Sequence, residues 1–488
     1  MPQAPVVIGV DSSTQSTKAL FVDAQSGRVL ATGRAPHRVD GADGARESDP
    51  EQWWRALGEA VAAGLEEAGV AASAVAGIAV AGQQHGLVVL DRAGRPLRPA
   101  LLWNDTRSAP QAAALTEALG GPGAWTARTG SVPVAAVTAA KWRWLYENEP
   151  AHASAAAAIR LPHDFLTERL AGTAATDPGD ASGTGWYSTA TGAYDPELLG
   201  LLGLDASLLP TVAATGATRV GSLTAGAADA LGLPAGIAVA AGTGDNMAAA
   251  VGLGLGGAGL LDHPVLSLGT SGTVFAATRT RPGSPALSGF AATDGTFLPL
   301  ACTLNCTLAV DKVAALLGLG RDDAEPGGEA VLLPYLDGER TPDLPTAAGL
   351  LTGLRHSTTG PQLLGAAYEG AVFTALSALD DLLRACGLTD AEAAARPLRL
   401  IGGGARGRTW IETVRRLSGR PLIVPRATEL VALGAAALAA AAVTGADPVA
   451  TAAAWGTGEG AALEPVARDT AAWERIGAVL DRAAPMLG

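Results

Sequence analysis

The sequence is poor in cysteine and in charge. Three of its 488 residues are cysteine and 17% are charged. Three thiols are too few for a disulfide framework, so we interpret Cys302 and Cys306 as buried thiols rather than half of a metal site. Positive charge is scarcer than negative charge, and the net charge of −13 argues against a nucleic-acid partner, which needs a basic face.

No apolar run is long enough to cross a membrane. The most apolar stretch, Leu430–Val443, is short and consists mostly of alanine, so it predicts a buried helix. The start of the chain has no basic segment, and its apolar run ends at Asp11, which argues against a signal peptide. We therefore expect a cytoplasmic protein with no membrane partner. The length, together with 48% hydrophobic residues, favours two domains.

Glycine, in contrast, is abundant and gathers in turns that follow apolar runs. In the stretch Gly236–Gly254, Ile237–Ala241 predicts a buried strand, a Gly-Thr-Gly turn ends it, and Met247–Val251 predicts a helix. Asp245 therefore lies where a strand ends and a helix begins, a position at which α/β sheets bind ligands. Two interpretations are open for this residue: a catalytic acid, or the N-cap of the helix.

Two hairpin tips carry hydroxyl side chains between predicted strands. They are residues 11–18, with the sequence DSSTQSTK, and residues 269–273, with the sequence GTSGT. Such tips can bind a phosphate through backbone N–H groups and hydroxyls, although a plain surface turn has the same composition. Thr14–Thr17 aligns with Thr270–Thr273, and only the first copy supplies an acid, Asp11, where the second has a serine. We interpret the pair as one structural unit used twice.

Polar side chains also follow the strand predicted at Val75–Ala81. Gly82–Gly86 has the sequence GQQHG, which suits a sugar better than a core, although His85 fits a solvated loop equally well. Trp103–Arg107, with the sequence WNDTR, suits a polyhydroxyl ligand or a capped helix start with a buried tryptophan. Later in the chain, the strand, glycine turn and helix around Gly402–Ala405 would let a nucleotide approach the backbone closely.

Together these motifs resemble the FGGY family of carbohydrate kinases, within the actin-like ATPase superfamily, over about Val6–Ala442. Gly82–Gly86 and Trp103–Asp105 resemble the xylulokinase branch of that family most. Asp180–Thr184, in a polar segment that we expect to be a loop, and Gly338–Pro342 resemble the same branch.

The resemblance implies an α/β fold with two ribonuclease H-like lobes around a central cleft. Residues 1–253 would form the N-terminal lobe, with the sugar site and the first phosphate loop, and residues 254–488 the nucleotide-binding C-terminal lobe. The implied reaction is phosphorylation of D-xylulose by ATP with Mg²⁺; another ketose or a polyol, such as ribulose or glycerol, is the alternative acceptor. The implied partners are the sugar and ATP, with a homodimer as the assembly. The net charge and the sugar motifs argue against a DNA-binding repressor or a filament protein of the same fold.

The resemblance also implies roles for individual residues. Asp245 would be the general base, and Asp11 would be the second catalytic residue as the metal ligand. The sugar would contact Gln84, His85, Trp103, Asn104, Asp245 and Asn246. ATP would contact Ser13, Thr14, Gln15, Thr17, Lys18, Thr270, Ser271, Gly272, Gly403, Gly404 and Ala405. Two positions depart from the family pattern: Ser13 stands where glycine is common, and Gly407 where serine or asparagine is often found.

Overall fold

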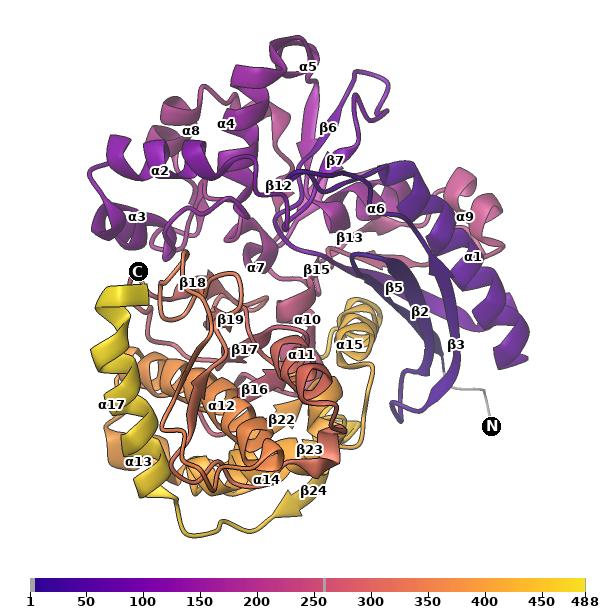
Figure 1. The fold of residues 1–488 in the computed structure, drawn as a ribbon. Helices are drawn as coiled ribbons and strands as arrows, with labels where there is room; N and C mark the ends of the chain where they lie inside the picture. The colour runs from indigo at the N-terminus through magenta and orange to yellow at the C-terminus, as the bar shows by residue number, and fades with distance from the viewer. Residues whose placement is uncertain (1–4, 258–259, 488) are drawn as a thin grey trace.

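The computed structural model describes residues 5–257 and 260–487 as two lobes, each built around a seven-stranded sheet (Figure 1). The first sheet has the order β13-β14-β5-β1-β2-β3, with β15 paired to β5. Its strands are β1 (Val6–Ser12), β2 (Ser16–Asp23), β3 (Val29–Pro36), β5 (Val75–Gly82), β13 (Arg219–Ser222), β14 (Ala238–Ala240) and β15 (Thr243–Gly244). The second sheet has the order β18-β19-β17-β16-β22-β23-β24. Its strands are β16 (Val265–Leu268), β17 (Gly272–Phe275), β18 (Ser288–Ala291), β19 (Phe297–Thr303), β22 (Leu398–Ile401), β23 (Leu422–Pro425) and β24 (Gly460–Leu463).

The two sheets share a core of six strands with one topology. In the first, β1, β2 and β3 form an antiparallel meander, and β5 and β14 continue from β1 as parallel strands. In the second, β16, β17 and β19 form the meander, and β22 and β23 are the parallel strands. Beyond the parallel strands, each sheet ends in an antiparallel strand: β13 pairs with β14 in the first sheet, and β24 pairs with β23 in the second. This repetition agrees with the two ribonuclease H-like lobes expected from the sequence.

The second hairpin is shorter than the first at its tip. In the first hairpin Asp11 pairs with Lys18, whereas in the second Ser267 pairs with Thr273. The segment between these pairs is therefore one residue shorter in the second copy. The predicted one-to-one alignment of the two tips is wrong beyond the turn, because Thr273 takes the place of Lys18 and not of Thr17. The charged pair Asp11 and Lys18 of the first hairpin is therefore replaced by the uncharged pair Ser267 and Thr273 in the second.

Helices cover both faces of each sheet. One face of the first sheet is covered by α1 (Pro50–Ala68), α6 (Pro162–Ala171) and α9 (Ala225–Leu231). One face of the second sheet is covered by α11 (Thr307–Leu317), α12 (Gly360–Ala385) and α14 (Arg408–Ser418). Two further helices, α10 (Asp245–Gly252) and α15 (Leu430–Thr444), lie where the lobes meet (Figure 1). Although α15 comes late in the sequence, it packs on β1 and β5 of the first sheet.

Helix α10 contacts both lobes through opposite faces. Ala248 and Val251 belong to the apolar cluster of the first sheet, which also contains the alanines of α15. Met247, Ala250 and, just past the helix, Leu253 belong to the apolar cluster of the second sheet. The residue at the start of α10 is therefore held at the junction of the lobes.

Small residues permit this packing. A side chain at Gly434 of α15 would collide with the carbonyl oxygen of Ala248 in α10, and one at Gly9 of β1 would collide with that of Ala432. The three backbones thus approach more closely than larger residues would allow. This explains the alanine-rich composition of Leu430–Val443, which forms a buried helix as predicted.

Two helix starts show how local sequence sets the structure. Asp49 caps α1, since its side chain accepts a hydrogen bond from the backbone N of Glu51. The segment 177–187, predicted to be a loop, instead contains the short helix α7 (Pro178–Ala181). Asp177 caps this helix by accepting from the backbone N of Gly179 and of Asp180, and Asp180 is fully buried.

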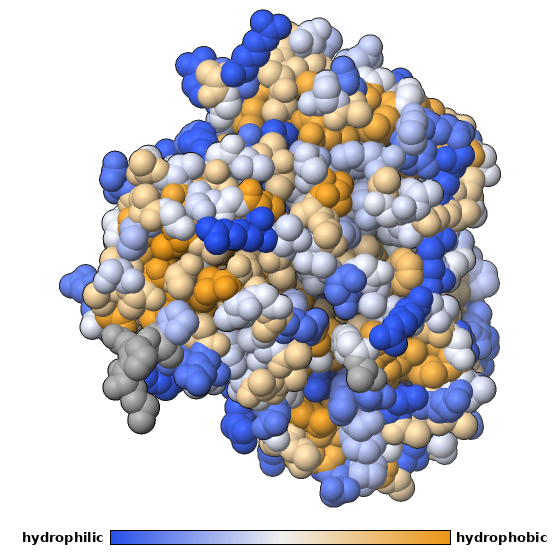
Figure 2. Space-filling view, turned by 180° about the vertical axis from the view of Figure 1, so that it is seen from behind, coloured by the Kyte–Doolittle hydropathy of each residue, from blue (hydrophilic) through white to orange (hydrophobic). Residues whose placement is uncertain are grey.

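The back of the molecule intersperses hydrophilic and hydrophobic residues (Figure 2). Within residues 5–257 and 260–487, no single helix has the length and hydrophobicity needed to cross a membrane. Helices α15 and α16 (Pro448–Ala454) would meet that requirement only as a pair, and they are bent by 115° where they join.

The packing of α10 on α15 predicts the effect of adding one methyl group. Gly434→Ala should lower the free energy of unfolding by about 1–3 kcal/mol, because the new Cβ forces the two helices apart. Gly200→Ala in α8 (Pro196–Leu202) is the matched control, since its Cβ would meet no atom within 4 Å. Urea unfolding of both variants checks this. Equal stability of the two variants would contradict the account of the helix contact.

Candidate active site

A cavity of about 160 Å³ lies between the two lobes. Five of the predicted sugar residues and one predicted phosphate residue line it: Gln84, His85, Trp103, Asp245, Asn246 and Ser271. Ala136, Thr273, Ser288, Phe290, Leu300, Cys302 and Arg340 complete the lining. The fold thus brings together, at one place, residues from both lobes that the sequence suggested for different ligands.

Asp245 is the first residue of α10 and faces this cavity. The cap position is taken by Gly244, so the interpretation of Asp245 as the helix N-cap is wrong. Its Oδ1 accepts hydrogen bonds from the backbone N of Asn246 at 2.8 Å and from Asn246 Nδ2 at 3.1 Å. Burial, and then the negative charges of Asp11 and Asp180, raise the pKa of Asp245 to about 7. A carboxyl group with a pKa near neutrality suits proton transfer from a ligand.

Two amides continue from Asp245 into the first lobe. Asn246 Nδ2 donates to Gln84 Oε1 at 2.8 Å, and Gln84 Nε2 donates to Asp180 Oδ1 at 3.4 Å. Gln84 is the second residue after β5, and neighbouring backbone and side chains leave little room for a side chain at the glycines on either side, Gly82 and Gly86. A Cβ at Gly82 would lie 2.9 Å from the backbone N of His163, and a Cβ at Gly86 would crowd Pro162.

His85 is held in an unusual backbone conformation. Its φ is 64°, which is uncommon for a residue with a side chain, and such residues tend to cluster at functional sites. Its Nδ1 donates to the carbonyl oxygen of Gly183 at 2.9 Å, which leaves Nε2 as an acceptor. Burial, and then the positive charge of Lys141, lower the pKa of His85 to about 3. His85 is therefore a neutral, fixed acceptor and not a solvated loop residue.

Asp11 and Lys18 form the charged part of the first hairpin. Asp11 Oδ1 accepts from Ser13 Oγ at 2.6 Å, a bond that a glycine at this position could not make. Asp11 Oδ2 lies 3.8 Å from Lys18 Nζ, which donates to Glu429 Oε2 at 2.6 Å. Burial raises the pKa of Asp11 despite Ser13 and Lys18, so its charge is only partly compensated.

The tip of the first hairpin touches the sugar side of the cavity. Trp103 Nε1 donates to Thr14 Oγ1 at 3.0 Å. The indole is 42% exposed, so the interpretation of Trp103 as a buried residue at a helix start is wrong. Gln15 is exposed at the tip, whereas Thr17 is fully buried with its hydroxyl 3.2 Å from that of Ser12.

The second hairpin lies beside the glycine turn that follows β22. The backbone N and the Oγ1 of Thr307, at the start of α11, donate to the carbonyl oxygen of Gly269 at 3.1 and 2.8 Å. Gly404 packs against Leu268, where an added Cβ would lie 2.8 Å from the Leu268 side chain. The structure thus groups two sets of predicted ATP residues: Thr270, Ser271 and Gly272 with Gly403, Gly404 and Ala405.

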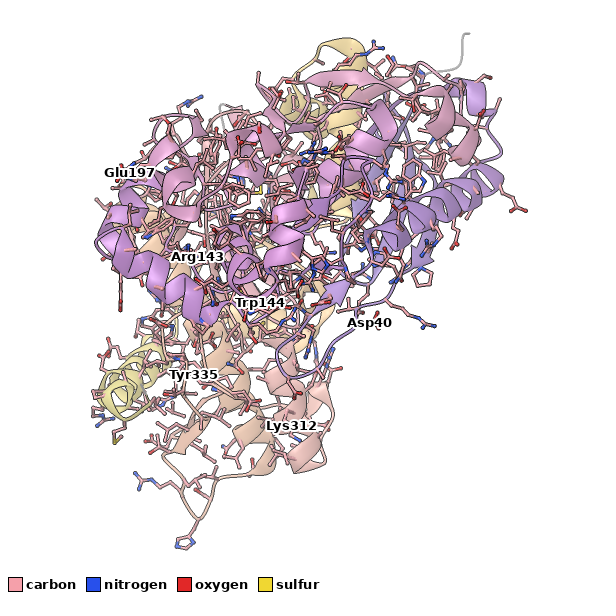
Figure 3. All side chains as sticks on the ribbon, turned by 90° about the horizontal axis from the view of Figure 1, so that it is seen from above. Asp40, Arg143, Trp144, Glu197, Lys312 and Tyr335 are labelled. Atoms are coloured by element: carbon pink, nitrogen blue, oxygen red, sulfur yellow. The ribbon has the colours of Figure 1, made fainter. Side chains whose placement is uncertain are left out.

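The segment after Trp103 has a mainly structural role. Asn104 is not among the residues that line the cavity, and its buried Oδ1 has no hydrogen-bond partner in the part of the chain that the structure describes. Arg107 donates to Asp105 and to Glu47. Its guanidinium carbon also lies 4.5 Å from the ring centre of Trp144 on α4 (Thr138–Asn148), labelled in Figure 3.

Sequence reasoning missed two residues that line the cavity, Arg340 and Phe290, and one, Lys141, that holds the backbone of the lining residue Ala136. Arg340 lines the cavity from the second lobe, and the Gly-Glu-Arg-Thr-Pro loop was a local signal for it. Phe290 places its ring 5.6 Å from that of His85, but nothing in its local sequence marks it. Lys141 is buried, and its Nζ donates to the carbonyl oxygens of Ala135, at 3.1 Å, and of Ala136. Burial lowers the pKa of Lys141 to about 7.

Two lobes with matching phosphate-type hairpins and a cavity with an acid between them fit a sugar kinase, and the comparison with known families agrees. Models for the N-terminal and C-terminal domains of the FGGY family of carbohydrate kinases match residues 6–252 and 265–443. The chain therefore belongs to the FGGY family of carbohydrate kinases, whose members use ATP as the phosphoryl donor.

Close relatives match the chain along its whole length. Two curated proteins, the xylulose kinases of Streptomyces rubiginosus and Streptomyces coelicolor, are each 58% identical to it over 99% of this chain and 98% of their own. The crystal structure of xylulose kinase from Bifidobacterium adolescentis is 33% identical and covers 98% of this chain and 99% of its own, with a TM-score of 0.82.

The hydrogen bond from His85 to Gly183 predicts a fixed tautomer. Nitrogen NMR of the protein should show the His85 ring neutral and protonated on Nδ1 throughout pH 5 to 8, about two units or more above its lowered pKa. His85→Asn identifies the signal by its loss, because asparagine tolerates the positive φ. A His85 signal that titrates near pH 6.5 would contradict the geometry.

Proposed function

We propose that this kinase transfers the γ-phosphoryl group of ATP to D-xylulose and forms D-xylulose 5-phosphate. The observation that carries the proposal is Asp245, whose carboxyl group faces a cavity shared by both lobes and has a pKa of about 7. The similarity to xylulose kinases over the full length supports D-xylulose as the acceptor.

Asp245 would act as the general base. A sugar hydroxyl is a weak nucleophile until its proton is removed, and phosphoryl transfer otherwise needs mainly positioning and charge stabilisation. As the hydroxyl oxygen bonds to the γ-phosphorus, its proton passes to Asp245, and the bond to the leaving oxygen of ADP breaks. Asn246 holds the carboxylate through Oδ1, so Oδ2 would accept the proton.

The two hairpins would hold the phosphates of ATP. Lys18 stands next to Asp11 and supplies a positive charge, and Ser13, Thr14 and Gln15 supply hydroxyl, amide and backbone donors at the same tip. Thr270, Ser271 and Gly272 would act from the second lobe. The turn of Gly403, Gly404 and Ala405 lies beside that second hairpin and would approach the adenosine.

The residues of the first hairpin fit Mg²⁺. Asp11 is buried, and its raised pKa shows that its charge is poorly compensated, so a cation beside it would be favourable. Mg²⁺ is typically bound by one or two carboxylates together with water and substrate phosphates. Asp11 would hold the ion, which would neutralise phosphate charge during the transfer.

The sugar would lie against the first lobe. Gln84, His85, Trp103 and Asn246 line the cavity around Asp245 and offer both donors and acceptors to hydroxyl groups. Asn104, which the sequence also suggested as a sugar contact, does not line this cavity and is left out of the proposed sugar site. A site built on hydrogen bonds rejects ligands that leave its buried polar groups without partners, so it can distinguish one ketose from another.

The location and the assembly belong to the same proposal. Use of ATP and the free thiols of Cys302, Cys306 and Cys386 support a cytoplasmic location. A homodimer stays a prediction from the sequence, and light scattering after size-exclusion chromatography tests it.

Replacing the proposed base tests its role. Asp245→Asn should keep the melting temperature but lower kcat by roughly 10²–10⁴-fold, because the amide has a similar shape and cannot accept the proton. Asp49→Asn, at a helix cap of α1, is the matched control and should keep full activity. An Asp245→Asn enzyme with a kcat near that of the wild type would refute the general-base role.

The acceptor is tested by comparing kcat/KM for D-xylulose, D-ribulose, L-ribulose and glycerol. We expect D-xylulose to be preferred. His85→Asn should lower kcat/KM for D-xylulose by roughly tenfold, the effect of about 1.4 kcal/mol, while the KM for ATP stays the same. A wild type that prefers glycerol or a ribulose would overturn the proposed acceptor and leave the family unchanged.

A further inference from the structure

Behind Gln84 the first lobe contains a cluster of buried charged residues. His163 in α6 and its neighbours Asp164, Asp177 and Asp180 are each at most 1% exposed. His163 Nδ1 donates to Asp180 Oδ2 at 2.6 Å. His163 Nε2 lies 3.2 Å from Asp164 Oδ1, a contact of charges rather than a well-directed hydrogen bond. Burial alone would lower the pKa of His163, but Asp164 and Asp180 raise it to about 9, so the ring is positively charged at neutral pH.

Asp180 is fixed by both its backbone and its side chain. Asp177 accepts hydrogen bonds from the backbone N of Gly179 and of Asp180, each at 3.0 Å, and from Thr243 Oγ1 at 2.8 Å. These bonds tie the start of α7 to the residue just before Gly244 and Asp245. His163 holds the carboxylate from the other side, so Asp180 has little freedom to turn.

The charge of Asp180 sets the direction of every hydrogen bond that follows. An ionised carboxylate only accepts, so Asp180 Oδ1 requires the NH₂ group of Gln84 to face it. A flipped amide would set two oxygen atoms against each other. Gln84 Oε1 must then accept from Asn246 Nδ2, whose second hydrogen goes to Asp245 Oδ1. The orientation therefore passes from His163 to the proposed base.

This network fixes which hydrogen-bond donors and acceptors the cavity wall presents to a ligand. Both side-chain N–H groups of Asn246 already donate to other residues of the protein, so only its Oδ1 is available to a ligand, as a hydrogen-bond acceptor. Gln84 keeps one N–H group, and His85 Nε2 is an acceptor because Nδ1 donates to Gly183. Adjacent hydroxyl groups, each of which donates and accepts, match such an alternation of acceptor and donor.

We propose that Asp180, held by His163, is a positioning residue that orients the amides of Gln84 and Asn246 and thereby sets the affinity for the sugar. The inference rests on the proposed function, since it takes a polyhydroxyl acceptor to be the ligand. Asp180 acts through Gln84, and the cluster gives a role to Asp180 within the motif Asp180–Thr184 and to the His-Asp pair at the start of α6.

Two isosteric variants separate this role from a structural one. Asp180→Asn should raise the KM for D-xylulose at least about tenfold, the effect of ~1.4 kcal/mol, while the KM for ATP changes less than about twofold. Asp164→Asn is the matched control. Asp164 is as buried as Asp180 and contacts the same His163 ring, but Gln84 donates a hydrogen bond only to Asp180. Asp164→Asn should lower the melting temperature as much as Asp180→Asn does, but it should keep the wild-type KM for the sugar. Equal sugar KM values in the two variants would overturn the proposal.

A double-mutant cycle tests whether Asp180 acts through Gln84. Gln84→Met removes the amide at similar size, so Asp180→Asn should have no further effect on the sugar KM in that background. Independent, multiplicative effects would overturn the inference. If Asp180→Asn does not fold, calorimetry of D-xylulose binding to Gln84→Glu replaces it. An ionised glutamate cannot donate to Asp180, so affinity should fall at least about tenfold, and unchanged affinity would overturn the proposal.

The wild type distinguishes this inference from the function on which it rests. A wild type that does not phosphorylate D-xylulose refutes the proposed acceptor. A wild type that does so, with Asp180→Asn behaving like Asp164→Asn, refutes only the positioning role.

Discussion

The close packing of α10 between α15 and the second sheet is the contact on which the site depends. Because Gly434 and the alanines of α15 carry almost no side chain, the two helix backbones meet directly. The opposite face of α10 packs on the second lobe. Asp245 stands at the start of this helix, so the packing of the helix places it at the junction of the lobes. A bulky residue in α15 would displace Asp245 without touching it.

Uncompensated negative charge gives the site its chemistry. Asp245, Asp11 and Asp180 lie close enough to one another to raise the pKa of Asp245, and burial adds to the effect. Two nearby positive charges have partners other than Asp245: His163 pairs with Asp180 and Asp164, and Lys18 lies beside Asp11 and donates to Glu429. The base is consequently able to hold a proton near neutral pH, while room is left for the cations and phosphates that the family uses.

The parts of the fold and site that the sequence predicted are those with a local cause. Strands ending in glycine turns, and Asp245 between a strand and a helix, follow from a few adjacent residues. The one-residue difference between the hairpins was missed, because a glycine-rich tip fits several lengths. Phe290 near His85 depends on a contact between the lobes. The contact of His163 with Asp180 joins two residues 17 positions apart within the first lobe. Neither contact is marked by a pattern of adjacent residues in the sequence.

The pH dependence of kcat/KM for D-xylulose, with Mg²⁺ in excess over ATP, tests the central claim most directly. If the raised pKa of Asp245 governs proton transfer, kcat/KM should fall about tenfold for each pH unit below a pKa near 7 and level off above it. The deprotonated carboxylate is the active form, so the loss must appear on the acid side. A profile that stays flat from pH 5.5 to 8 would contradict the account.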